Sequence, residues 1–185
     1  MADSESVGIY YRREAYAETT SMRVATASSQ LPQAIMGREV ASQGFLQSLL
    51  RHGSWSALEV ILQAEADRVS LTELCQTTLA TASKPRHVHI TPIQELNKWL
   101  ASPTASVVYF PYPPEERFAA ARQAQAQHRV AFSGVTHTLC SQAAIEALWK
   151  FLHGPWQSYD RLVCTSQAVL EMVRNTTDAM QSYVL

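Results

Sequence analysis

The chain has 185 residues, of which 46% are hydrophobic and 17% charged, and its formal net charge is −1. This length fits one domain of ordinary size with a real hydrophobic core. The near-neutral charge, without any basic run, excludes a protein that binds nucleic acid mainly by electrostatics. No apolar run approaches the roughly 20 residues that a membrane-spanning helix needs, so we expect no transmembrane segment.

The cysteines and the N-terminus indicate the compartment. Cys75, Cys140 and Cys164 are scattered and form neither a C-x-x-C motif nor a framework of pairs. A reducing environment is therefore expected. The first five residues are acidic and lack the basic-then-apolar pattern of a signal peptide. Together these features predict a soluble, cytoplasmic protein.

Strands and helices are predicted to alternate along the chain. The β-rich or apolar runs predicted as strands are 7–11, 57–62, 87–90, 105–110, 130–132 and the segment around Leu162. The segments predicted as helices are 34–52, 71–79, 93–100, 115–127, a helix that carries Ile145 and Leu152, and a final helix from Val169 to Tyr183. This order predicts a single α/β domain over residues 1–185, a three-layer Rossmann-like fold with a mostly parallel sheet.

The segment SGVTHTLCS, residues 133–141, is the most informative for function. It places His137 on a turn of small residues between a predicted strand and a predicted helix. Ligands bind at the carboxyl ends of strands in open parallel sheets, where helix N-termini also offer N–H groups to anions. We interpret His137 as a candidate general base, phosphate or sugar contact, or metal ligand, with a structural cap as the alternative. A second such edge follows where the Leu162 strand ends at Thr165 and Ser166.

Other chemistry-bearing residues give weaker signals. His87 and His89 alternate and so share one face of a strand, but no third metal ligand lies at a suggestive spacing, and no metal site is predicted. Cys140 lies three residues beyond His137, yet no group that would orient a Cys/His pair is visible, so packing on the sheet is favoured. Gly37 begins a predicted helix and is a weak sign of a phosphate-binding loop. The G-x-G-x-x-G, P-loop and G-x-S-x-G motifs are absent.

Taken in order, several of these segments resemble the N-terminal half of a GT-B glycosyltransferase of family 4, the "group 1" type. The resemblance extends over residues 7–185. It rests on the segments MGREVASQGFL (36–46), LLRHG (49–53), GVTHT (134–138) and YDRLVCTS (159–166).

The resemblance implies two Rossmann-like domains that face each other across a cleft. The N-terminal domain would hold the acceptor, and the C-terminal domain would bind a nucleotide-sugar donor, usually transferring the sugar with retention of configuration. It further implies that His137 is catalytic and faces the transferred sugar, while no metal or resident cofactor is needed. The implied substrate-binding residues are Gly37, Arg38, Thr136, Thr138, Thr165 and Ser166.

The sequence departs from this family after Leu185, because no second Rossmann-like domain and no paired glutamates of the donor-binding E-x7-E type follow. We therefore expect an acceptor-side domain, truncated or half of a split enzyme and inactive alone. Its partner would be a donor-binding domain or separate subunit, and its acceptor a sugar or glycan. The alternative is a non-catalytic Rossmann-like module that binds a phosphorylated ligand or a protein. A small hydrolase is less favoured, since it would need the absent nucleophile elbow.

Overall fold

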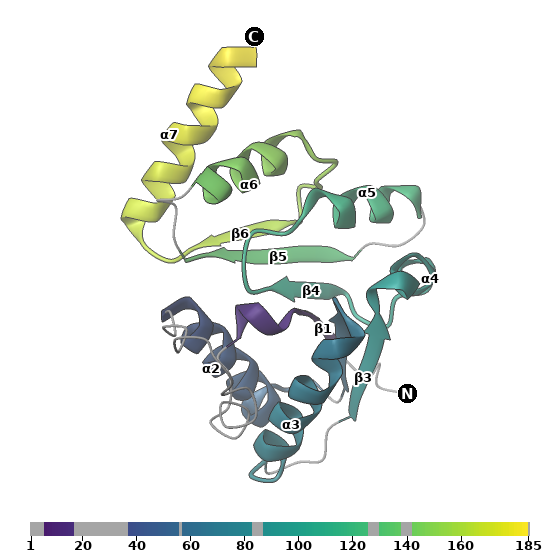
Figure 1. Ribbon diagram of the computed structural model, residues 1–185. Helices are drawn as coiled ribbons and strands as arrows, with labels where there is room; N and C mark the ends of the chain where they lie inside the picture. The colour runs from purple at the N-terminus through teal and green to yellow at the C-terminus, as the bar shows by residue number, and fades with distance from the viewer. Residues whose placement is uncertain are drawn as a thin grey trace, which may run out of the picture. The chain divides into compact units, whose positions relative to one another are not determined.

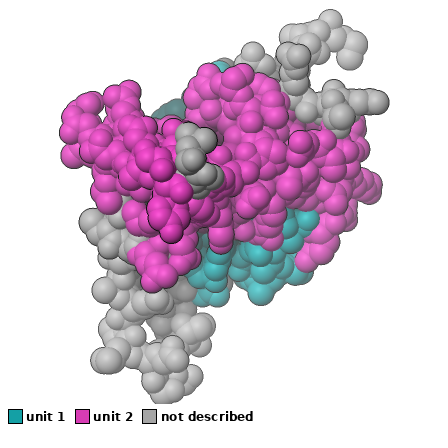
Figure 2. Space-filling model, turned by 90° about the horizontal axis from the view of Figure 1, so that it is seen from above, with its two compact units in different colours: residues 1–93 teal, residues 94–185 magenta. Residues whose placement is uncertain are grey.

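The structure is a computed structural model that describes residues 6–16, 37–55, 57–82, 87–125, 130–137 and 142–184. The chain divides into two compact units, residues 1–93 and 94–185 (Figure 2). Each unit is built in the same way, from three described parallel strands connected by helices (Figure 1).

The first unit has its strand β2 (Ala57–Leu62) at the centre of a parallel sheet. It pairs with β1 (Ser6–Tyr11) on one side and with β3 (His87–Pro92) on the other. The connections contain the helices α2 (Gly37–His52) and α3 (Arg68–Leu79) and the 3-10 helices η1 (Arg13–Ala15) and η2 (Glu65–Asp67). A third 3-10 helix, η3 (Ile93–Glu95), follows β3 directly.

One face of this sheet forms the core of the first unit. The side chains of Ile9, Leu58 and Val60 are fully buried, as are Leu46 and Leu50 of α2. Such a side chain contributes roughly 1.5–3 kcal/mol when it leaves water. Residue Tyr11 shares this face, because strand residues of equal parity point the same way. Its hydroxyl lies 3.2 Å from Ser70 Oγ of α3, so α3 covers this face of the sheet.

The second unit has its strand β5 (Ala131–Thr136) at the centre, between β4 (Val107–Phe110) and β6 (Arg161–Cys164). Its helices are α4 (Leu96–Ala101), α5 (Glu116–Ala124), α6 (Gln142–His153) and α7 (Gln167–Val184). Three phenylalanines from β4, α5 and β5 form the core. The ring centroid of Phe110 lies 4.8 Å from that of Phe118 and 5.7 Å from that of Phe132, and both ring pairs are edge to face.

A short repeat marks the end of one helix in each unit. The sequence His-Gly-x-Trp closes both α2 and α6, as residues 52–55 and 153–156. In each case the glycine N–H donates to a carbonyl four residues earlier. A Cβ atom on Gly53 or Gly154 would meet the indole of the following tryptophan at 2.0 or 2.5 Å. Glycine is therefore required at both positions, because the indole packs against its Cα. The glycine and the tryptophan together end each helix before the chain continues toward the next strand.

The predicted fold class, α/β with a mostly parallel, Rossmann-like sheet, is confirmed. Each unit is a βαβαβ segment with parallel pairing, which is the building block of doubly wound nucleotide-binding folds. The strand β5 is longer than expected, since it continues through Ser133 and Gly134 to Thr136. The small residues that suggested a turn are thus part of the strand.

Candidate functional site

The carboxyl ends of β5 and β6 bring together four of the residues singled out from the sequence. Thr136 is the last residue of β5 and is in register with Cys164, the last residue of β6. His137 follows β5 directly, while Thr165 and Ser166 connect β6 to α7. Ligands bind at this edge of parallel sheets, so the cluster is the candidate functional site of the second unit.

The two threonines fasten the strand ends to each other. The Thr136 hydroxyl donates to the carbonyl oxygen of Val163 at 3.3 Å, and Thr136 is buried. In return, the exposed Thr165 donates its hydroxyl to the Thr136 carbonyl oxygen at 3.0 Å. These bonds fix the backbone at the site. The hydroxyl protons of both threonines are used within the protein, which leaves each oxygen as an acceptor.

Ser166 caps the N-terminus of α7. Its Oγ accepts a hydrogen bond from Val169 N at 3.2 Å, and its carbonyl oxygen accepts one from Leu170 N at 3.0 Å. The N–H groups of Gln167 and Ala168 have no carbonyl partner within the helix, because the first turn lacks preceding residues. They point out of the helix end, where the backbone dipoles of an 18-residue helix favour negative charge.

His137 follows Thr136, which is hydrogen-bonded to Thr165, two residues before α7 begins. It is half-buried, and its backbone adjoins Thr136, whose carbonyl oxygen holds the Thr165 hydroxyl. The Nε2 atom of His137 is buried, and an imidazole is a group that can donate a hydrogen bond to an anion or move a proton. The arrangement therefore combines an imidazole, a capped helix N-terminus and acceptor oxygens at one edge of the sheet.

The turn after β4 packs against the same edge of the sheet. A Cβ atom on Gly134 would lie 2.5 Å from Pro114 Cδ and 2.6 Å from the Tyr112 carbonyl oxygen, so this turn packs directly on β5. Glu115 follows it, with Oε1 3.5 Å from the Tyr112 hydroxyl and Oε2 2.8 Å from Nε of Arg117. The signal in the sequence was a glycine between strand residues, which often marks a close backbone approach.

Gly37 and Arg38, expected to bind substrate, belong to the first unit. Gly37 begins α2, and a Cβ atom placed on it would meet nothing within 4 Å. The guanidinium of Arg38 lies 3.9 Å from Glu39 Oε1, and the Arg38 carbonyl oxygen accepts a bond from Ser42 Oγ. Thr138 and Cys140 lie outside the described residues.

A polar cluster at the carboxyl ends of β1 and β2 was also missed from the sequence. The Arg13 N–H donates to Oδ2 of the buried Asp67 at 3.3 Å, and the Tyr11 ring stacks on Tyr16 at 4.7 Å. Burial raises the pKa of Tyr11 to about 12, so its phenol stays protonated at neutral pH. Residues more than 50 positions apart meet here, which no local sequence pattern indicates.

Comparison with known proteins adds no assignment. No protein-family model matches the chain, and no curated protein matches its sequence. Among the described residues, no helix is long and apolar enough to cross a membrane.

Proposed function

We propose that the second unit binds a phosphorylated small molecule, such as a sugar phosphate or a nucleotide-sugar, at the carboxyl ends of β5 and β6. The observation that supports this proposal is that His137 and the N-terminus of α7 each follow one of two neighbouring strand ends, β5 and β6. The bond from the Thr165 hydroxyl to the Thr136 carbonyl oxygen at 3.0 Å joins those two strand ends. Phosphate is the ligand that free helix N–H groups and an imidazole donor fit best.

The expected affinity is modest. A helix N-terminus contributes about 0.3–1 kcal/mol toward a negative charge, and a hydrogen bond to a charged group about 1.5–3 kcal/mol. After the entropic cost of association, a dissociation constant on the order of 0.1–1 mM is expected, equivalent to roughly 4–5.5 kcal/mol. The remaining affinity would come from contacts to the sugar or base.

Glycosyl transfer is the reaction that we propose for this ligand class, with the chain as the acceptor side of a nucleotide-sugar-dependent glycosyltransferase. The position of His137 favours it, because a half-buried imidazole at the strand end can face a sugar held beside the helix N-terminus. Thr165 and Ser166 would line the same wall, and a separate donor-binding domain would hold the nucleotide. A non-catalytic binding module is the alternative.

The test of ligand binding uses two variants that keep the helix cap. Asp and Asn both cap helices as well as Ser, so Ser166→Asp and Ser166→Asn both preserve the fold. Only the aspartate places a negative charge at the anion site. Calorimetry with a nucleoside diphosphate-sugar should show binding to the wild type and to Ser166→Asn, and at least a tenfold loss for Ser166→Asp. Equal affinity of the two variants contradicts the proposed site.

The test of the reaction separates binding from transfer. His137→Ala should weaken binding of the phosphorylated ligand, whereas Thr177→Ala, which removes a hydroxyl bonded only to the Arg174 carbonyl oxygen of α7, should leave it unchanged. Sugar transfer by the purified chain alone should be undetectable. Transfer by this chain alone that His137→Ala abolishes would place the whole active site here and contradict the acceptor-side proposal.

A further inference from the structure

The strand register places two histidines and one glutamate on the same face of the first unit. In the parallel pair of β2 and β3, His87 is in register with Ala57 and His89 with Glu59. Residues paired in this way point to the same side of the sheet, as do alternate residues of one strand. This is the face opposite α3, because Tyr11, which contacts Ser70 of α3, belongs to the other parity.

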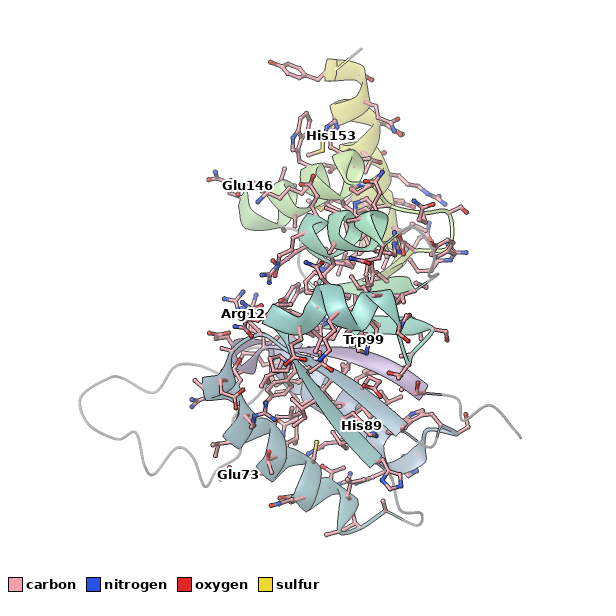
Figure 3. The ribbon with its side chains drawn as sticks, turned by 90° about the vertical axis from the view of Figure 1, so that its right-hand side faces the viewer. Arg12, Glu73, His89, Trp99, Glu146 and His153 are labelled. Carbon is pink, nitrogen blue, oxygen red and sulfur yellow. The ribbon has the colours of Figure 1, made fainter. Side chains whose placement is uncertain are left out.

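The two imidazoles are accessible. His87 and His89 are both exposed on β3, a strand with β2 as its partner within the first unit. Their ring centroids lie 6.5 Å apart with the rings tilted by 47°. Figure 3 shows His89 on β3, away from the α3 helix that carries Glu73. Exposed side chains change rotamer within picoseconds to nanoseconds, so both rings can turn toward a common point.

Glu59, in register with His89, is the carboxylate beside the two histidines. The residue is only 6% exposed, its carboxylate oxygens are not fully buried, and among the described residues they have no hydrogen-bond or ion-pair partner. Its neighbour on the other strand, β1, is Gly8, which has no side chain to offer. A carboxylate that lacks a partner at the end of its side chain is available to bind a cation, as carboxylates in metal sites do.

From this juxtaposition we propose that His87, His89 and Glu59 bind a divalent transition-metal ion of the zinc type. Two imidazoles and one carboxylate form a ligand set that suits Zn²⁺, Cu²⁺ and Ni²⁺ and disfavours Mg²⁺ and Ca²⁺, which take oxygen ligands. No group of three such side chains already surrounds a common point within the described residues. Binding therefore includes rotation of the histidine rings, with zinc–nitrogen distances of about 2.0–2.1 Å as the end point.

The experiment titrates the untagged, chelator-treated full chain with Zn²⁺ and Cu²⁺, by calorimetry and by competition with a chromophoric indicator. One ion per chain is expected, bound more tightly for Cu²⁺ than for Zn²⁺, with no signal for Mg²⁺. His87→Ala and His89→Ala should each weaken binding at least tenfold. His52→Ala and His153→Ala remove exposed histidines of α2 and α6 and serve as matched controls that leave affinity unchanged.

The Glu59→Gln variant shows whether Glu59 is a metal ligand or only a structural residue. If Glu59 is a ligand, the substitution should change the thermal midpoint and the zinc affinity in opposite directions. Removing the buried charge should raise the thermal midpoint of the metal-free chain, while zinc affinity falls about tenfold. The proposal is overturned if the His87→Ala/His89→Ala double variant still binds one ion with wild-type affinity, or if the wild type binds no ion. Unchanged zinc affinity in Glu59→Gln would exclude the glutamate from the site.

Discussion

Arg122 makes several hydrogen bonds and ring contacts within the second unit. Its guanidinium forms a bidentate pair with Asp160, at 2.6 Å from Nη1 to Oδ1 and 2.7 Å from Nη2 to Oδ2. Asp160 also accepts from the backbone N–H groups of Phe132 and Gln157, each at 2.8 Å. The guanidinium stacks on Phe132 with 4.6 Å from Cζ to the ring centroid. This pair joins α5, β5 and the segment before β6, and thereby holds the strands that form the candidate site.

Replacing Asp160 by Asn should destabilise the chain strongly. The change leaves a buried guanidinium without its counter-charge and turns an amide toward two N–H donors, at an expected cost of about 3–5 kcal/mol in the free energy of unfolding. The matched control is Glu115→Gln, which breaks the half-exposed ion pair with Arg117 and should cost less than about 1 kcal/mol. Urea denaturation of both variants measures the difference. Similar losses in the two would contradict the central role of this pair.

Tyr11 should make the stability of the chain fall in alkaline solution. Burial raises its pKa to about 12, against about 10 in the unfolded chain. The folded state therefore holds the phenolic proton more tightly, and the resulting stabilisation is complete below pH 10 and lost as the pH rises from 10 to 12. Its size is on the order of 2–3 kcal/mol.

Tyr11→Phe tests this while keeping the ring that stacks on Tyr16. The free energy of unfolding, measured between pH 8 and 12, should depend less steeply on pH in the variant. Burial also raises the pKa of Tyr109 to about 12, so this residue remains in both proteins as an internal reference. An identical pH dependence of the variant and the wild type would show that the Tyr11 phenol ionises freely in the fold.

At the scale of elements, the strands were predicted well where burial alone decides them. The segment 57–62 matches β2 at both ends, because Leu58, Val60 and Ile61 are packed on both faces of the sheet. The strand β5 was cut short after Phe132, since Ser133 and Gly134 have low intrinsic preference for strands. Tertiary packing against the Tyr112–Pro114 turn overrides that preference.

Two glycine substitutions should change the free energy of unfolding in opposite directions. Gly134→Ala tests the packing of the turn on β5, and Gly44→Ala is the comparison at a position with open space. Gly134→Ala should lower the free energy of unfolding by about 1–3 kcal/mol, because the new methyl group meets Pro114 and the Tyr112 carbonyl oxygen. Gly44→Ala should raise it by roughly 0.5–1 kcal/mol, because Gly44 lies within α2 with nothing within 4 Å of a Cβ atom. Thermal unfolding of both variants is the measurement. A neutral Gly134→Ala would mean that the turn does not rest on β5.

At the scale of the whole molecule, the α/β class and the order of elements followed from the alternation of buried strands and helices. The cluster of Thr136, His137, Thr165 and Ser166 was also predictable, because the carboxyl ends of neighbouring parallel strands share an edge. The pairing of Glu59 with His89 was not, since the sequence does not state which strands are neighbours. Register is set by long-range packing, and it alone brings the glutamate beside the histidines.

Amide NMR can locate a phosphorylated ligand bound at the carboxyl ends of β5 and β6, beside the N-terminus of α7. During titration of the ¹⁵N-labelled chain with a nucleoside diphosphate-sugar, the amide signals of His137, Gln167 and Ala168 should shift together and saturate with one dissociation constant. The helix α3, including Glu73 in Figure 3, should show no change. Saturating shifts confined to the first unit, or none at all at millimolar ligand, would contradict binding at this site.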